Sequence, residues 1–345
     1  MSGVHQLQVA PGGGRDPQGM GDEKKMDDKA TGLLEAGIQD FRARQERGLA
    51  RLITLVEASP ELSNSILSRI GESPAQSQCH VIGFTGPPGA GKSTLVNAVT
   101  AVLRGEGHRV GIIAVDPTSP FSGGAMLGDR IRMERHYLDP GVFIRSLATR
   151  GGVGGLSPAT RDVIKLMRAF GFDYILVETV GVGQTELDIM AAVDTVAVVL
   201  VPEAGDSIQA MKAGLMEIAD VFVVNKADRP GGQEFESALR AMLGLAQQRR
   251  PWEPPVVTAQ ADQDVGSAEV MAALNRHAQY LRQSGELDIR RTLREERELL
   301  DMAFAHLGQR WKAIKGRPEW AELAAGVISR RVGVDRFLKA IAESA

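Results

Sequence analysis

The sequence predicts an α/β fold with a mostly parallel central sheet flanked by helices. Three observations support this prediction: an apolar run over residues 79–84 leads into a glycine-rich loop, an amphipathic pattern follows the loop, and further apolar runs alternate with helical patterns. We expect a disordered tail over residues 1–28, a helical extension over 29–74, the sheet domain over 75–284 and a C-terminal helical arm over 285–345.

The composition is that of an ordinary globular protein. Of the 345 residues, 43% are hydrophobic and 24% are charged, and the formal net charge is −3. This charge provides no positive field, and no apolar run approaches the ~20 residues of a membrane span, so we expect neither nucleic acid nor a membrane as partner. The lone Cys79 cannot form an intramolecular disulfide, which favours a cytoplasmic location.

The glycine-rich loop has the pattern of a phosphate cradle. Its backbone N–H groups would wrap phosphates, and the following helix adds the positive end of its dipole. Lys92 would reach the β- and γ-phosphates, and the Ser93 hydroxyl would bind Mg²⁺. The pattern is typical of phosphate-loop NTPases, and the expected nucleotide-binding residues are Gly86, Pro87, Pro88, Gly89, Ala90, Gly91, Lys92, Ser93 and Thr94.

Before this loop, apolar residues recur at three- and four-residue steps from Gly32 to about Ser59, which predicts one amphipathic helix. A second, short helix is expected over residues 61–70. Such helices more often pack than take part in chemistry, so we expect them to dock on the sheet domain.

Three carboxylates are candidates for the metal shell and the attacking water. Asp116 follows the strand predicted over 109–115, and Glu178 ends the strand predicted over 174–178. Both lie at the sheet edge where open α/β folds bind ligands, and Asp129 lies in a polar segment between them. Because Asp116 precedes a proline, a plain turn-forming role stays open for it.

Gly181 is expected to bring its backbone N–H to the γ-phosphate. Small signalling GTPases place a water-orienting Gln directly after this glycine, whereas this chain has Val182. We therefore predict slow unassisted hydrolysis, with Lys92, Asp116 and Glu178 as the catalytic residues.

The strand predicted over 194–201 opens into a loop on the same edge as the phosphate loop. Its residues Asp206, Gln209 and Lys212 are candidates to sense the nucleotide. From spacing alone, the simpler interpretation is a helix that begins at Asp206 as its cap.

The tetrapeptide Asn225-Lys226-Ala227-Asp228 ends the last clear central strand and predicts guanine recognition. The Asp228 carboxylate would accept hydrogen bonds from guanine N1–H and the 2-amino group together, a pair that adenine does not offer. Asn225 would support the opposite edge, and the Lys226 stem would pack along the base. Thr258 and Ala259 are weaker candidates for a backbone N–H to guanine O6. The expected ligands are GTP or GDP with Mg²⁺.

The C-terminal arm carries an apolar stripe on a highly charged helix, formed by Leu293, Leu300, Phe304, Leu307 and Trp311. Such a stripe needs a cover. The residues leave open whether a second subunit or the chain's own N-terminal helices provide it.

Together these segments resemble the MeaB/ArgK family of G proteins. The matching stretches are Gly86–Thr94, Ala114–Pro120, Glu178–Gln184 and Asn225–Asp228, and the resemblance runs from about residue 32 to the C-terminus. It implies a homodimeric GTPase that chaperones an adenosylcobalamin-dependent acyl-CoA mutase, typically methylmalonyl-CoA mutase. Family members gate cofactor loading and protect or rescue the mutase.

The resemblance also implies roles for individual residues. Lys92 and Ser93 would hold phosphate and Mg²⁺, and the metal shell and attacking water would be served by Asp116, Asp129 and Glu178. The loop 202–212 resembles the family's extra switch, which couples nucleotide state to the mutase and favours a role for Gln209 and Lys212. The charged arm resembles the family's dimerisation arm.

Three other functions fit parts of this pattern. A metal-insertion GTPase would need clustered ligands, whereas this chain has one Cys and six scattered His. An ATP-dependent kinase linked to amino-acid transport is disfavoured by the Asn225–Asp228 segment. A passive GTP-binding module is the third, and the missing Gln after Gly181 keeps it open.

Overall fold

The computed structural model describes residues 31–71, 78–116, 134–148, 158–179, 189–202, 215–245, 251–314 and 318–343. The chain forms two compact units that divide between Arg276 and His277. The first unit holds the sheet, and the second is helical. Asp129, Gly181, Asp206, Gln209 and Lys212, which the sequence proposes as site residues, lie outside the described residues.

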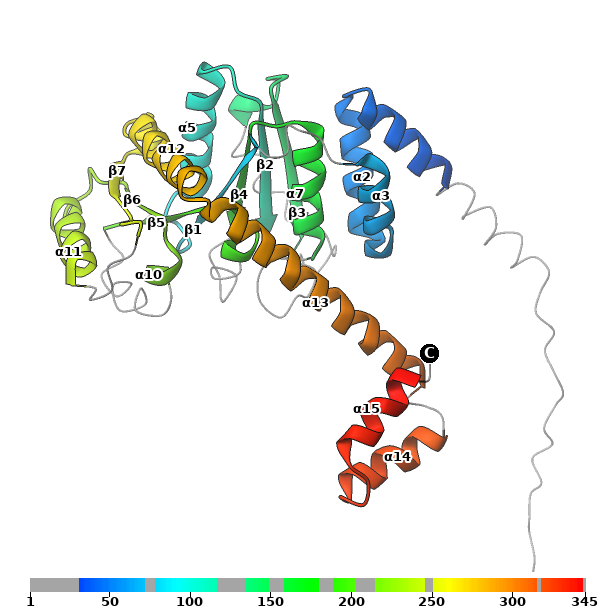
Figure 1. The fold of residues 1–345 in the computed structure, drawn as a ribbon. Helices are drawn as coiled ribbons and strands as arrows, with labels where there is room; N and C mark the ends of the chain where they lie inside the picture. The colour runs from blue at the N-terminus through cyan, green and yellow to red at the C-terminus, as the bar shows by residue number, and fades with distance from the viewer. Residues whose placement is uncertain are drawn as a thin grey trace, which may run out of the picture. The chain divides into compact units, whose positions relative to one another are not determined.

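The core of the first unit is a seven-stranded sheet in the order β3-β2-β4-β1-β5-β6-β7, in which every neighbouring pair is parallel. The predicted parallel α/β fold is therefore confirmed (Figure 1). The strands are β1 (His80–Thr85), β2 (Val110–Asp116), β3 (Val142–Ala148), β4 (Tyr174–Thr179), β5 (Thr195–Leu200), β6 (Val221–Asn225) and β7 (Val256–Ala259).

Helices cover both faces of this sheet, because successive strand residues point to opposite sides. On β1, Val81 belongs to the apolar cluster on one face and Ile82 to the cluster on the other. The helices α7 (Pro158–Phe170), α10 (Leu215–Ile218) and α11 (Gly232–Leu245) contribute to the first cluster. The second cluster contains residues of α5 (Lys92–Gly105) and of the first turns of α12 (Ser267–Ser284).

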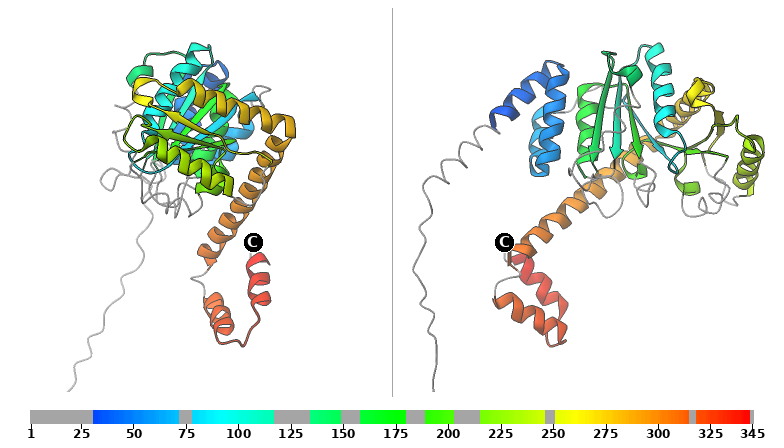
Figure 2. Two further views of the ribbon diagram at one scale, coloured as in Figure 1. Left: turned by 90° about the vertical axis from the view of Figure 1, so that its left-hand side faces the viewer. Right: turned by 180° about the vertical axis from the view of Figure 1, so that it is seen from behind.

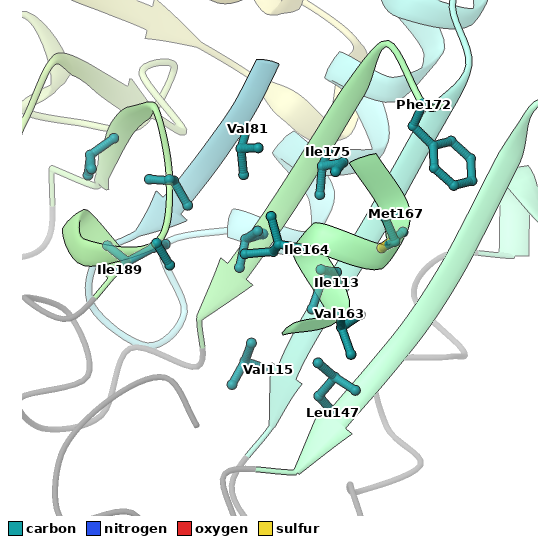
Figure 3. Packing of buried hydrophobic residues seen from close by; sticks show 14 of the residues in the cluster. Val81, Ile113, Val115, Leu147, Val163, Ile164, Met167, Phe172, Ile175 and Ile189 are labelled. Atoms are coloured by element: carbon teal, nitrogen blue, oxygen red, sulfur yellow. The ribbon is translucent and has the colours of Figure 1, made fainter. Parts of the chain in front are cut away.

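Figure 3 shows the first cluster from close by, where α7 lies over the sheet. Val163, Ile164 and Met167 of α7 are at most 5% exposed, and they face strand residues such as Ile113 and Ile175. Each aliphatic side chain of this size contributes about 1.5–3 kcal/mol when it leaves water. This packing fixes α7 and, through it, the strand β4 that follows.

The N-terminal extension differs from its prediction. The single helix expected from Gly32 to Ser59 is wrong, because residues 31–42 form one helix, the chain turns, and α2 (Glu46–Ala58) forms another. Arg44 in the turn has a left-handed φ of 58°. A Cβ on Gly48 would lie 2.3 Å from the Phe41 backbone nitrogen, so the two helices cross at a distance that only glycine allows.

The extension docks on α7, beside the β3 edge of the sheet (Figure 2). The Arg44 guanidinium donates a 2.9 Å hydrogen bond to the Ala169 carbonyl at the C-terminal end of α7, where cations complement the helix dipole. The 3₁₀ turn η1 (Pro60–Leu62) and α3 (Ser63–Ile70) complete the extension, as the short second helix predicts. The N-terminal helices therefore pack on α7 within the first unit.

Gly83 of β1 allows the turn before β5 to lie close against the sheet. A Cβ on Gly83 would lie 2.5 Å from Cδ1 of Ile189, in the turn η3 (Ile189–Ala191) that leads into β5. Ile189 is fully buried at this contact. The missing side chain thus lets η3 lie directly on the strand that carries the phosphate loop.

The second unit contains α13 (Glu286–Ile314), α14 (Pro318–Ile328) and α15 (Val334–Glu343). Gly285, with φ of 74°, separates α12 from α13, and the Tyr280 hydroxyl donates a 2.9 Å bond to Glu286 across this break. Trp320 of α14 packs edge-on against Phe337 of α15. The sequence did not predict α14. None of the described helices is long and apolar enough to cross a membrane.

Much of the predicted apolar stripe on α13 is exposed in this chain. The exposed fractions are 59% for Leu293, 56% for Leu300 and 69% for Phe304. An apolar row of this kind along one helix is unusual for a surface that water alone covers.

Candidate nucleotide-binding site

The phosphate loop leaves the carboxyl end of the central strand β1 and enters α5. Gly86 has φ of 139°, and a Cβ there would lie 2.1 Å from the Val199 carbonyl oxygen of β5. The loop therefore turns tightly over the neighbouring strand, which a side chain would prevent. Since α5 begins at Lys92, directly after the loop, the N-terminal N–H groups and the positive dipole end of the helix lie beside the loop.

The Lys92 ammonium is held inside this loop. Its Nζ donates hydrogen bonds of 2.9 Å to the Gly86 carbonyl and 3.0 Å to the Pro87 carbonyl. The residue is only 6% exposed. A positive charge is thus fixed at the point where the backbone donors converge, which suits a polyphosphate anion.

Ser93 and Glu178 form the candidate metal position. The Ser93 hydroxyl donates a 2.6 Å hydrogen bond to Oε1 of Glu178, and both residues are 6% exposed. A hydroxyl beside a carboxylate is the hard oxygen set that Mg²⁺ prefers, and Mg²⁺ at phosphate sites usually takes one or two protein oxygens. These residues therefore fit Mg²⁺.

The other predicted metal-side residues are only partly placed. Asp116 is the last residue of β2, the strand beside β4, so its backbone ends at the same sheet edge as Glu178. Its side chain, like Asp129 and Gly181, is not among the described parts of the chain. Among the residues that are described, no group of three or more His, Cys, Asp and Glu side chains is arranged to hold a metal ion.

The Asn225–Asp228 segment lies against the phosphate loop. Asn225 donates a 2.8 Å hydrogen bond through Nδ2 to the Ala90 carbonyl, and Lys226 donates a 2.9 Å bond to the Gly89 carbonyl. A Cβ on Gly91 would lie 2.4 Å from Nδ2 of Asn225. The structure thus brings the two predicted motifs together, although 135 residues separate Ala90 from Asn225.

Asp228 and the loop after β7 complete this side of the site. Asp228 is exposed, whereas Asn225 is 2% exposed. Thr258 is exposed, and the Ala259 carbonyl accepts a 3.1 Å hydrogen bond from the Ala227 N–H. The Asp228 carboxylate is therefore accessible next to the buried Asn225, an arrangement that suits recognition of the edge of a base.

Sequence reasoning missed Ala261. Its backbone N–H donates a 3.1 Å hydrogen bond to Oδ1 of Asn225, so the Asn225 amide joins the phosphate loop to the loop after β7. The one signal in the sequence for a role of Ala261 is that it directly follows the Thr258–Gln260 stretch. The hydrogen-bond partner of a backbone N–H cannot be read from the residue types.

Comparison with known proteins agrees with this geometry. The family model described as methylmalonyl Co-A mutase-associated GTPase MeaB matches residues 49–315. A putative GTPase of Pyrococcus abyssi is 44% identical over 316 residues, which cover 90% of this chain and 97% of that protein. The GTPase ArgK of Escherichia coli is 37% identical, over 74% of this chain and 78% of ArgK.

A mammalian relative and a solved structure are also similar. The mouse mitochondrial methylmalonic aciduria type A homolog is 34% identical, over 79% of this chain and 68% of that protein. A crystal structure of a LAO/AO transport system kinase has a TM-score of 0.66 and 27% identity, and the match covers 90% of this chain and 97% of that one. With a phosphate cradle bound to a guanine-type motif and a family match over most of its length, the chain belongs to the MeaB family of methylmalonyl-CoA mutase-associated GTPases.

Proposed function

We propose that this GTPase is a chaperone of an adenosylcobalamin-dependent acyl-CoA mutase, most directly methylmalonyl-CoA mutase. It gates loading of the mutase cofactor and protects or reactivates the mutase during turnover. The observation that carries the nucleotide part of this proposal is the hydrogen bond from Asn225 to Ala90, because it joins a phosphate cradle to a guanine-type motif. Family membership supports the mutase as client.

The nucleotide is GTP, held at both ends. The loop 86–94 and the Lys92 ammonium bind the phosphates, and Asp228 binds the guanine edge. Lys226 and the backbone at Thr258 and Ala259 line the base side. Gly181 contacts the γ-phosphate through its N–H.

Mg²⁺ would be held at this site by Ser93 and Glu178, with Asp116 and Asp129 also serving the metal shell. The chemistry that the ion would supply is neutralisation of negative charge on the phosphate oxygens. Glu178 and Asp116 also hold the attacking water by hydrogen bonds, and Lys92 stabilises charge on the leaving oxygens. Because Val182 stands where small GTPases have Gln, hydrolysis is slow until the client is bound.

The loop 202–212 transmits the nucleotide state to the mutase, with Asp206, Gln209 and Lys212 as the coupling residues. A homodimer forms through the apolar stripe of α13, since Leu293, Leu300 and Phe304 are more than half exposed in the single chain. The cytoplasmic location favoured by the lone Cys79 stays a prediction.

The test is GTP hydrolysis by the purified protein, alone and with an adenosylcobalamin-dependent methylmalonyl-CoA mutase. We expect slow turnover alone and at least a tenfold rise with the mutase, which corresponds to about 1.4 kcal/mol of barrier. Lys92→Ala removes the positive charge that binds the phosphates, and it should abolish turnover both with and without the mutase. Arg47→Gln, in the N-terminal extension, is the matched control for loss of one positive charge.

Each outcome separates one alternative. Unchanged turnover with the mutase contradicts the proposed client and favours a passive GTP-binding module. Faster turnover of ATP than of GTP contradicts guanine recognition and favours the kinase alternative. Stimulation by a nickel-enzyme precursor instead of the mutase favours the metal-insertion alternative.

A further inference from the structure

The loop that follows β7 is closed on itself. Gln260 and Val265 exchange backbone hydrogen bonds of 2.9 and 3.2 Å, which tie off residues 260–265 as a compact loop. We call these residues the base-side loop. It contains the 3₁₀ turn η4 (Ala261–Gln263) and Asp264, whose φ is 57°. Through the Ala261 N–H, this loop holds Asn225 in place.

Arg135 binds this loop from outside. One guanidinium nitrogen of Arg135 lies 3.0 Å from Oδ1 and 2.8 Å from Oδ2 of Asp264, so both carboxylate oxygens accept from it. The two side chains are 59% and 48% exposed. They come from segments that are 129 residues apart, and strand pairing does not require the contact.

The turn that carries Arg135 is held against α5, the helix that follows the phosphate loop. It lies in the turn η2 (Glu134–His136), and the neighbouring His136 is 5% exposed. The His136 Nε2–H donates a 3.1 Å hydrogen bond to the Asn97 carbonyl of α5, one turn beyond Ser93. A buried anchor on α5 thus holds the guanidinium in reach of Asp264, which lowers the entropy that an exposed ion pair usually loses.

We propose that Arg135 is a positioning residue of the nucleotide site, which acts through Asp264 to brace the base-side loop. The brace keeps Ala261 against Asn225, and Asn225 against the Ala90 carbonyl of the phosphate loop. It adds to two other contacts of the base-side loop, which are the direct packing of η4 on α5 and the Asn225 amide that joins this loop to the phosphate loop. Its effect is slower release of the guanine nucleotide. Since the base is common to GDP and GTP, both nucleotides are affected equally.

The test is nucleotide release from the full-length protein with Mg²⁺, followed by stopped-flow with fluorescent GDP and a fluorescent non-hydrolysable GTP analogue. The variants are Arg135→Gln, Asp264→Asn and the double variant. Asn is chosen because it tolerates the left-handed backbone of Asp264. Arg47→Gln, which breaks the 3.0 Å pair with Asp40 in the N-terminal extension, is the control for loss of an exposed ion pair.

We expect each single variant to speed release of both nucleotides by the same factor, about three- to fivefold for an exposed pair of this geometry. The double variant should be no faster than the faster single variant, because the two residues act as one unit. Salt near 0.5 M should bring the wild type close to the variants, since it screens the pair. Arg47→Gln should leave release unchanged, and all four variants should unfold at temperatures similar to that of the wild type.

Several results would overturn the proposal. The first is an unchanged release rate in Arg135→Gln and Asp264→Asn, and the second is a double variant whose rate increase is the product of the two single increases. The third is an equal increase in Arg47→Gln, and the fourth is an increase in the release rate of the GTP analogue alone. The last result would place the effect at the γ-phosphate instead of the base. If the wild type binds neither nucleotide, the guanine-nucleotide assignment of the site fails first, and that failure is visible before any variant is compared.

Discussion

The Ser93 hydroxyl of α5 donates a 2.6 Å hydrogen bond to the Glu178 carboxylate at the end of β4, and both side chains are buried. Two oxygen donors that fit Mg²⁺ are therefore aligned by elements that pack into the core. Glu178→Gln keeps the shape but removes the charge. We expect the Mg²⁺ concentration for half-maximal GTP turnover to rise at least about tenfold, because hydrogen bonds and contacts to charged groups are worth about 1.5–3 kcal/mol.

The measurement is GTP turnover at increasing Mg²⁺ concentration, with Glu57→Gln as control. Glu57 pairs with Arg145 between α2 and β3, so this variant removes a partly buried carboxylate far from the loop. An unchanged Mg²⁺ requirement for Glu178→Gln would contradict the metal role.

Asp228 is exposed at the end of a segment whose Asn225 is buried, which suits it to meet the edge of a guanine. Asp228→Asn should weaken GTP binding by about ten- to a hundredfold, since it removes a charged acceptor of two hydrogen bonds. Affinity for xanthosine triphosphate should rise relative to GTP, because xanthine has a carbonyl where guanine has its 2-amino group. Competition binding measures both, and Asp262→Asn in the exposed η4 turn is the control. Equal loss in both variants would argue against base recognition by Asp228.

Gly89 and Gly91 offer a matched pair of substitutions in the phosphate loop. Both have positive φ, 76° and 83°, so alanine strains the backbone by about 1 kcal/mol at each. A Cβ on Gly91 also meets Asn225 Nδ2 at 2.4 Å, whereas a Cβ on Gly89 meets nothing within 4 Å. We expect Gly91→Ala to weaken GTP binding far more than Gly89→Ala in a calorimetric titration. Similar losses would show that backbone strain alone matters.

Gly83 allows η3 to rest on β1, with Ile189 Cδ1 only 2.5 Å from the place of a Cβ. Gly83→Ala should lower the free energy of unfolding by about 1–3 kcal/mol through overpacking. Ile189→Ala should cost about 2–5 kcal/mol by leaving a cavity. The double variant should cost less than the sum, because the new methyl group enters that cavity. Denaturant unfolding gives all three values, and strict additivity would exclude direct contact.

The Arg104 guanidinium lowers the pKa of Asp139 through paired 2.8 Å hydrogen bonds, and the Gly141 N–H adds to the effect. A lowered pKa in the folded state means that this pair stabilises the protein above the unfolded pKa of about 3.9. The stabilisation is lost as pH falls through the folded pKa. Asp139→Asn should therefore be less stable than the wild type at pH 7. The difference in unfolding temperature between the two proteins should become smaller below about pH 4.

Thermal unfolding between pH 7 and pH 3 checks this prediction. Asp262→Asn, an exposed carboxylate in η4, should show no gap at either pH. A gap that widens in acid would mean that the wild-type pair does not depend on ionised Asp139.

The sequence predicts those parts of the site that lie on one continuous segment. The loop 86–93 and the Asn225–Asp228 segment are each recognisable because a buried strand, a turn and a helix start follow one another locally. Their contact with each other depends on β1, β5 and β6 lying side by side, which residue spacing alone does not determine. The same holds for Ser93 with Glu178 and for Arg135 with Asp264.

Helix boundaries were predicted less well than the sheet. Between Phe41 and Leu49 the sole apolar residue is Ala43, but the eight-residue step still fits two helical turns, so the spacing does not by itself predict a turn between residues 42 and 46. Gly48 is a further signal, because an isolated glycine costs a helix about 1 kcal/mol relative to alanine and so weakens the prediction of one continuous helix. On the sheet, long apolar runs flanked by Gly, Pro and Asp left fewer alternatives, and the predicted strands lie within one or two residues of the observed ones.

The central place of β1 has a consequence for the order in which the protein matures. Its neighbours are β4 and β5, so Val81 pairs with Ile175 and Ile82 with Thr195. During synthesis, the strand that carries the phosphate loop has no neighbour until β4 has emerged, and its second side stays unpaired until the chain has reached Leu200. The loop gains its contact from Asn225 later still, and Asn225 is secured only when Ala261 has emerged. Such long-range pairing slows folding, and nucleotide capture is among the last events on the way to the native state.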